Sequence, residues 1–520
     1  MGGESRSYGG LVTLSIIVNY VLGVGLLALP YVFRVAGIGL AVVAIVIGGI
    51  FTHITAMLVA EAEDLSKRAL RNGSLVLPGS VFSSHVCSSS PVLTETSPML
   101  RRTTAASAPS AIAVNSGDVE VLSATAGAAP RLDPPLEVVD MVHLYYGPRV
   151  RVAYIIGLGT YLVGGLWAYT AIFAVALGAA FPLKFAVAPE HRAGLTCDAH
   201  AGFESDCELV YLVYIAVFAA IVIPLSFVDA ASQWLVQIVL TVARYVTIAM
   251  MMIIPVAALY TDSVDAAPGA PAHPPHIAPG ADDLFRWTGT GLALLTGLYS
   301  LVFQHSVPGI LAPHRNKASI PLVLALSIAS ISILYIGLGI ASALYFGEST
   351  QPSINVNYST FRYGRADGTN VPLWGKICND IIVLFPGISS ISTYPLIALT
   401  LANSALVTLP LSITGAPGSA KRARATWVTR AAVAIPPVVG AVFVRNLTTI
   451  LSYAAILAIA IGLVMPAGIW LGAVRHAAAH GIDRVAPYAS VFTSRITAGT
   501  SLAFGVACLA AFVVGLVAKS

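Results

Sequence analysis

The apolar stretch 11–35 carries glycines and a proline that interrupt its expected helix beside a polar side chain. Asn19 and Gly23 lie four residues apart, hence on one helical face, and Gly23-Val24-Gly25 is followed by Pro30. Glycine and proline weaken a helix interior by about 1 and 3 kcal/mol, so we expect a break here. Amides at the start of the second half-helix would suit a carboxylate, and carbonyls freed from the first half would suit a small cation. The predicted substrate-binding residues of this break are Asn19, Gly23, Val24, Gly25 and Leu26. The alternative is that the glycines only allow close helix packing.

A second apolar stretch, 288–311, is interrupted in a similar way about five spans later. Gly297 lies within it, and Ser306-Val307-Pro308-Gly309 is typical of a helix start with Ser306 as the N-cap. Side chains upstream would line a pocket for a small organic molecule, and they are Tyr299, Ser300 and Phe303. His305 would sense or relay a proton, or would only hydrogen-bond the unwound backbone. Two matched broken helices indicate a binding site near the membrane midplane.

Hydroxyl side chains gather in the stretch 373–409. Ser389 shares a helical face with Ser392 and Thr393. If they face the carbonyls freed at the first break, they complete an oxygen-rich site for a coupling cation. Serine and threonine in membrane helices also bond to their own backbone, so a packing role is the alternative.

Arg244 lies near the middle of the apolar stretch 233–260. A central arginine costs roughly 2.5–3.5 kcal/mol on insertion scales, which makes it a candidate functional residue. By depth in the membrane its nearest candidate partner is Asp380, and the alternative is a snorkelling side chain. For His53, also within a span, simple packing is favoured.

These residues lie in a chain with the composition of a membrane protein. Of its 520 residues 57% are apolar and 10% are charged, against about 25% charged in soluble domains. The net charge of +4 is too small and too dispersed to indicate nucleic acid. Five cysteines show no zinc-ligand spacing. With no phosphate-binding loop and no Ser/His/Asp arrangement either, we expect no enzyme and no cofactor beyond a coupling Na⁺ or H⁺.

A helix needs about 20 apolar residues to cross the roughly 30 Å hydrocarbon layer. This rule predicts an all-α integral membrane fold with eleven helices, with membrane lipid as a partner. The helices are expected at 11–35, 38–60, 151–181, 209–228, 233–260, 288–311, 319–346, 373–409, 427–444, 448–473 and 492–517.

Basic residues in the short loops set the expected orientation, because Lys and Arg collect on the cytosolic side. The basic loops at 315–317, 421–424 and 475–484 all fall on one side of the eleven-span order. The sequence therefore predicts a cytosolic N-terminus.

The spans divide the chain into six segments. They are 1–60 with helices one and two, the loop 61–150, 151–260 with helices three to five, the outer Pro/His-rich loop 261–287, 288–473 with helices six to ten, and 474–520 with a loop and helix eleven. The loop 61–150 is rich in Ser, Ala, Thr and Pro, which predicts a disordered cytosolic loop ending in a short amphipathic piece at 136–146. It is either a plain linker or the binding site of a cytosolic partner.

Two outer loops carry candidate modification sites. Cys197 and Cys207 would form a disulfide in an oxidising compartment, or stay free thiols if the topology is inverted. Asn357-Tyr358-Ser359 is a glycosylation sequon in an outer loop, whereas the sequon at Asn72 falls on the cytosolic side and should stay bare.

The chain resembles the amino acid/auxin permease family, and within it the transmembrane protein 104 group. The matching stretches are 10–38, 300–313 and 384–403, and the most specific motif is Gln304-His305-Ser306-Val307-Pro308. The resemblance implies two inverted five-helix repeats plus an eleventh helix, with an amino acid bound between broken helices one and six. It also implies sodium or proton coupling near helices one, five and eight, where Arg244 would act as a fixed positive charge in place of the ion.

The leading hypothesis is therefore a secondary active transporter of small amino acids or related zwitterions. It would be a multi-pass protein of the plasma membrane or of lysosomal or endosomal membranes. The alternative hypothesis is a sensor or receptor that binds an amino acid without transporting it and signals through the cytosolic loop.

Overall fold

Helices account for nearly all of the secondary structure that the computed structural model describes. The structure describes residues 7–23, 25–75, 136–181, 183, 205–228, 234–261, 284–351, 353–359, 361, 363, 371–416, 418–443 and 456–517. Within these ranges there is no β-strand, only an isolated bridge between Tyr8 and His314. The all-α fold class predicted from composition and periodicity is confirmed.

Nine helical segments of the described residues are long and apolar enough to cross a membrane, or ten when a bent pair is counted as one span. The bent pair is α1 (Gly10–Val21) and α2 (Gly25–Ala36). The other long helices are α3 (Ile38–Arg71), α4 (Val138–Ala180), α5 (Ser205–Leu225), α6 (Trp234–Thr261), α10 (Ile320–Phe346), α12 (Leu373–Thr408), α14 (Ala420–Phe443), α16 (Met465–Ala479) and α17 (Arg495–Val517). All of them except α17 belong to the nine segments, and the remaining segment is Trp287–Leu311. The sixth predicted span is divided into α8 (Thr290–Tyr299), the 3-10 turn η6 (Gln304–Ser306) and α9 (Val307–Leu311).

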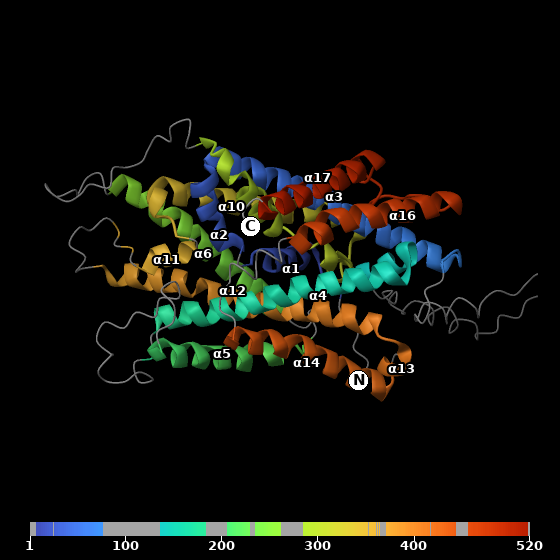
Figure 1. Cartoon of the computed structure of the whole chain (residues 1–520), viewed down its shortest axis with the longest axis horizontal. Helices are drawn as coiled ribbons and strands as arrows, with labels where there is room; N and C mark the ends of the chain where they lie inside the picture. The colour runs from blue at the N-terminus through green and yellow to red at the C-terminus, as the bar shows by residue number, and fades with distance from the viewer. Residues whose placement is uncertain are drawn as a thin grey trace, which may run out of the picture.

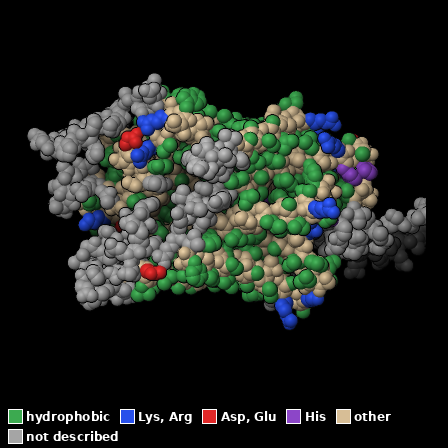
Figure 2. Space-filling view, in the orientation of Figure 1, with side chains coloured by type: hydrophobic (Ala, Val, Ile, Leu, Met, Phe, Trp, Pro, Cys, Tyr) green, Lys and Arg blue, Asp and Glu red, His purple; other side chains and the backbone are tan. Residues whose placement is uncertain are grey.

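The long axis of the molecule runs across the membrane. In Figure 2 hydrophobic side chains cover the middle of the visible face, and lysine and arginine lie towards its two ends. This band is the expected surface of a protein surrounded by lipid. The chain is a multi-pass membrane protein, while the eleventh span and the two inverted repeats stay predictions.

The helices pack as two groups joined by α6 (Figure 1). One group consists of α4, α5, α12 and α14, with α12 packed along α4. In the other group α10 contacts α1, α2 and α3, and α8 packs against α2 and α3. Helix α6 contacts α1 and α10 on one side and α12 on the other. We call these the α4 group and the α10 group.

Helix α3 continues to Arg71, well beyond residue 60, where the sequence predicted the start of a disordered loop. The extra turns carry salt bridges between residues four apart, Glu63 with Lys67 at 2.7 Å and Asp64 with Arg68 at 2.8 Å. Such pairs stabilise a polar helix that hydropathy alone does not detect. Residues 76–135 of the predicted loop lie outside the described residues.

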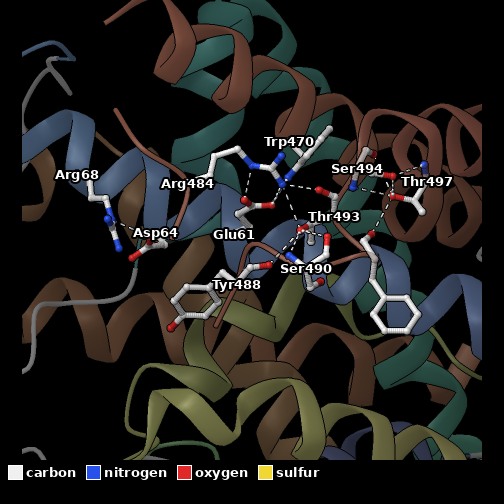
Figure 3. Close-up of polar contacts among 11 residues, drawn as sticks. Glu61, Asp64, Arg68, Trp470, Arg484, Tyr488, Ser490, Thr493, Ser494 and Thr497 are labelled. Carbon is white, nitrogen blue, oxygen red and sulfur yellow. Dashed lines mark hydrogen bonds and ion pairs between the residues drawn. The ribbon is translucent and has the colours of Figure 1, made fainter. Parts of the chain in front are cut away.

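A buried carboxylate holds this extension against the C-terminal part of the chain (Figure 3). Glu61 accepts hydrogen bonds from Trp470 Nε1 at 2.7 Å and from Arg484 Nε and Nη2 at 2.7 and 3.0 Å. Arg484 also donates to the carbonyl of Thr493. Glu61 therefore connects α3 to α16 and to the segment between α16 and α17.

The start of α4 contains the predicted amphipathic piece. Residues 138–146 are helical, and the chain then turns at Gly147, whose φ of 80° and ψ of −178° lie outside the helical region. Pro148 follows, where a proline suits the first turn of the next helical part. Figure 1 shows the start of α4 at the same end of the molecule as the C-terminal ends of α3 and α16 and the short helix α13 (Leu411–Thr414). We call this the inner end.

Candidate functional site

The first predicted break is present between α1 and α2, whose axes differ by 59°. Gly23 passes so close to α4 that a Cβ built on it would lie 2.0 Å from the hydroxyl oxygen of Tyr169. No side chain fits at this position unless Tyr169 moves. Val24 lies outside the described residues.

The second break lies between α8 and α9, where residues 300–303 leave the helical path. Its backbone is partly held by Gln304, whose Oε1 accepts from the Phe303 N–H at 2.9 Å and whose Nε2 donates to Thr55 at 2.9 Å. The new helix begins after Ser306, but the predicted side-chain cap is not formed. Ser306 is the last residue of η6 and has φ −101° and ψ −5°, whereas a capping residue is normally extended. Its hydroxyl donates instead to Thr400 Oγ1 at 3.3 Å.

The two breaks touch each other. A Cβ on Gly25 would lie 2.6 Å from the Ser300 hydroxyl oxygen. Beside them the buried hydroxyl of Tyr335, on α10, reaches both the Val21 carbonyl at 3.2 Å and the Ser300 carbonyl at 3.0 Å. One side chain thus satisfies an acceptor freed from each broken helix, as the lack of water in a bilayer demands.

A cavity of about 40 Å³ lies between the breaks and the α4 group. Its lining residues are Tyr20, Val21, Gly23, Gly25, Tyr161, Leu162, Gly165, Tyr169, Tyr299, Ser300, Val302 and Ile397. At 10–15 Å³ for each water molecule, it has room for about three. The structure thus holds a small compartment with four tyrosines in its wall, Tyr20, Tyr161, Tyr169 and Tyr299.

The contribution of α4 to this cavity was missed from the sequence. Tyr161, Gly165 and Tyr169 follow one another at intervals of four, so they lie along one helical face. Tyr161 packs edge-on against Tyr299, with ring centroids 6.1 Å apart. Two tyrosines and a glycine on one face of an apolar span were the sequence pattern that could have indicated this wall of the cavity.

Arg244 occupies the position that the sequence assigned to a coupling cation. Its Nη1 donates to the carbonyls of Asn19 and Leu22, each at 2.7 Å. Its Nη2 donates to the Ser389 carbonyl at 2.7 Å, the Ser392 hydroxyl at 2.5 Å and the Thr393 hydroxyl at 2.6 Å. The guanidinium is therefore bound by five neutral oxygens, three from backbone and two from side chains.

The predicted pairing of Arg244 with Asp380 is wrong. Asp380 is exposed near the start of α12, nine residues before Ser389 and so roughly 13 Å away along the helix. Arg244 is only 1% exposed and bends instead to the first break. The positions of the two residues along their helices indicated similar depths in the membrane, but the sequence could not give the direction in which either side chain points.

Several predicted residues are buried beside the cavity without lining it. The Asn19 side chain donates to Gln237 on α6, to its carbonyl at 2.7 Å and its Oε1 at 2.8 Å. Leu26 and Phe303 are fully buried in the core. His305 Nε2 hydrogen-bonds the Tyr20 hydroxyl at 2.7 Å, and His305 Nδ1 has no partner among the described residues. His305 is thus one residue removed from the cavity wall.

The remaining candidates lie away from the cavity. His53 packs edge-on against Phe492, with centroids 4.8 Å apart, in line with a packing role. Asn357 is half-buried and donates to the Ser349 carbonyl at 3.0 Å. The predicted Cys197–Cys207 disulfide lies outside the described side chains.

Two broken helices around an enclosed cavity define the class of site found in secondary transporters of small solutes. A comparison of sequences then gives the family. The profile of the family described as transmembrane amino acid transporter protein matches residues 137–507, more than two thirds of the chain. The chain belongs to this family. The matched region includes the second break and Arg244 but not the first break.

Similarity to individual proteins is lower. The chain is 27% identical to the transmembrane protein 104 homolog of Caenorhabditis elegans over 196 residues, which cover 38% of this chain and 35% of that protein. It is 25% identical to transmembrane protein 104 of Mus musculus over 255 residues, 47% of this chain and 46% of the mouse protein. The match to the Drosophila melanogaster homolog, 23% over 431 residues, covers 76% and 75%. The matched regions thus span about a third to a half of the worm and mouse proteins and three quarters of the fly protein.

Proposed function

We propose that this protein is a secondary active transporter of small amino acids or related zwitterions. The observation that carries the proposal is the cavity enclosed by the two broken helices, in a chain of the amino acid transporter family. The substrate carboxylate would bind the amides at the start of α2, near Gly25, where the partial positive charge of the helix N-terminus lies.

The size and the walls of the cavity limit the substrate. Tyr161 and Tyr299 would face the substrate side chain, and Ser300 would place a hydroxyl beside it. A cavity of about 40 Å³ favours the smallest side chains. Glycine, alanine and serine are the expected substrates.

Alternating access would come from movement of the α10 group against the α4 group. The cavity lies between these groups. Its walls come from α1, α2, α8 and the second break on one side, and from α4 and α12 on the other. A hinge at each break would let the half-helices move separately. The inner end is proposed to face the cytosol, as the basic loops indicate.

We further propose that coupling uses protons and that Arg244 permanently replaces a bound cation. Its five oxygen partners leave no vacant ligand set for sodium at this position. Arginine hardly deprotonates in proteins, so Arg244 supplies a fixed charge and another group must carry the proton.

The test is counterflow in proteoliposomes that contain the purified full-length chain. Liposomes are loaded with one unlabelled amino acid and the entry of the labelled form is measured, for each of the twenty amino acids, in sodium and in choline buffers. We expect saturable exchange of small amino acids that is equal in the two buffers. Absence of saturable exchange for every amino acid would refute the transport function.

A further inference from the structure

Three carboxyl groups gather at the inner end, where the start of α4 packs against the extension of α3. Glu63 accepts from Lys67 Nζ at 2.7 Å and from the Leu136 N–H at 3.3 Å. Asp140 has Arg151 Nη2 at 4.0 Å from its Oδ1. The carboxyl of Glu137 makes neither a hydrogen bond nor an ion pair with any of the described residues, although Glu137 is only 7% exposed.

Glu137 faces the second broken helix and the polar side chains below the cavity. A Cβ on Gly309, in the first turn of α9, would lie 4.0 Å from Glu137 Oε1. Tyr154 lies within electrostatic range of both Glu137 and Tyr20, and Tyr20 lines the cavity. The buried hydroxyl of Tyr154 has no partner among the described residues. Tyr20 and Tyr154 thus lie between the cavity wall and Glu137, and the hydroxyl of Tyr154 is unpartnered among the described residues.

The surroundings of Glu137 favour its neutral form in the closed structure. Burial, together with the nearby negative charges of Asp140 and Glu63, raises the pKa of the Glu137 carboxyl to about 8, and Lys67 lowers it in part. The charged and titratable groups around it are Glu63 and Lys67 on α3, Asp140, Arg151 and Tyr154 on α4, Tyr20 on α1 and Lys317 beside α9.

The position of Glu137 links its protonation to the conformation. It precedes α4, in the α4 group, and its carboxyl lies beside Gly309 of α9 and within electrostatic range of Glu63 on α3, and α3 and α9 pack with the α10 group. Separation of the groups at the inner end would hydrate the carboxyl and return its pKa towards the ordinary value of 4.5. Between these two pKa values the closed state holds a proton that the open state releases, so binding of the proton favours closure.

We propose that Glu137 is the proton-binding site that couples the proton gradient to transport. This inference rests on the proposed transport function. One proton from water adds to a carboxylate oxygen of Glu137 when the inner end is closed, and the same proton leaves to water when it opens. No other bond forms or breaks.

The test compares Glu137→Gln with Glu63→Gln in proteoliposomes of the full-length chain. Glutamine at 137 mimics the protonated carboxyl, whereas glutamine at 63 removes a charge from the same cluster and keeps an acceptor for the Leu136 N–H. Two quantities are measured with an amino acid that the wild type exchanges: counterflow at equal pH, and accumulation driven by a gradient of one pH unit. For one proton per substrate that gradient supports at most about tenfold accumulation.

The wild type and Glu63→Gln should both exchange and accumulate substrate, and Glu137→Gln should exchange it but reach only the external concentration. Accumulation by Glu137→Gln at the wild-type level overturns the proposal. Exchange by the wild type without any response to the pH gradient also overturns it and leaves the transport function standing. Absence of exchange in the wild type refutes both. If Glu137→Gln loses exchange, Glu137→Asp decides: recovery of exchange and accumulation supports the proposal, and failure of both assigns Glu137 a structural role.

Discussion

Replacing Arg244 by alanine should create a sodium site in a protein whose wild type we propose to be independent of sodium. The substitution removes a guanidinium whose four Nη hydrogens are shared among five oxygens, and it leaves all five oxygens in place. Both hydroxyls also bond to backbone carbonyls, Thr393 to Asn19 at 3.0 Å and Ser392 to Ser389 at 3.0 Å. The emptied space is then lined by carbonyl and hydroxyl oxygens, the ligands that hard cations prefer.

The size of the effect follows from these contacts. Loss of a large buried side chain costs about 3–5 kcal/mol. The five hydrogen bonds do not add to more, because burying the guanidinium itself costs several kcal/mol. Sodium at about ten times its dissociation constant returns about 1.4 kcal/mol of stability. For a protein of this length that corresponds to a rise in Tm of about 1 °C.

The assay measures the Tm of purified Arg244→Ala, and its amino acid exchange, in sodium chloride and in choline chloride. Sodium should raise both quantities in this variant and neither in the wild type. Arg430→Ala, which removes another arginine from a membrane helix, should show no response to sodium. Adding Ser392→Ala to Arg244→Ala should abolish the response. Equal Tm and equal exchange in both salts for a folded Arg244→Ala would refute the assignment of these oxygens as a cation site.

Three further changes probe separate parts of the structure. Tyr335→Phe removes the hydroxyl that donates to both breaks, at a cost of about 1.4 kcal/mol. The half-saturation concentration for exchange should rise about tenfold. An unchanged value would contradict a role of this hydroxyl in holding the two breaks together. Arg484→Ala leaves Glu61 buried without its cation and should cost about 3 kcal/mol in thermal unfolding. The control is Arg68→Ala, which removes a partner of an i,i+4 pair and should lower the free energy of unfolding by less than about 0.5 kcal/mol. Equal losses of stability in the two variants would contradict a stabilising role of the Glu61 contacts. In glycosylating cells Asn357→Gln should remove an attached glycan and Asn72→Gln should not, and the reverse mobility shifts on a gel would invert the proposed orientation.

Much of the fold was predictable because membrane crossing imposes simple rules of length and composition. The expected starts at 38 and 373 agree with α3 and α12, and the glycines and prolines correctly indicated where two spans break. The extension of α3 was missed, because a polar segment with charged residues is read as a loop unless its i,i+4 pairs are counted. Its stability also depends on Trp470 and Arg484, some four hundred residues away.

The candidate site was predictable in its kinds of residue but not in its contacts. Ser389 and Thr393 were expected to face the first break, and their hydroxyls donate to the carbonyls of Leu22 and Asn19 at 3.3 and 3.0 Å. The sequence did not show that Arg244 donates to the same two carbonyls. The direction of a long side chain depends on how helices rotate about their axes, which no sequence pattern on a uniformly apolar span encodes. For the same reason the contribution of Tyr161 and Tyr169 was not seen before the structure.

A matched pair of glycine substitutions on α4 tests most directly whether the cavity is the substrate site. Gly165 lines the cavity and Gly159 does not, and a Cβ on either would meet no atom within 4 Å. Leucine at 165 should fill the cavity without disturbing the fold, whereas leucine at 159 should be harmless. We predict that Gly165→Leu lowers saturable amino acid exchange at least tenfold while Gly159→Leu keeps it, with both proteins showing the wild-type Tm. Undiminished exchange by Gly165→Leu would contradict the account, because substrate would then pass through the protein without entering the space between its broken helices.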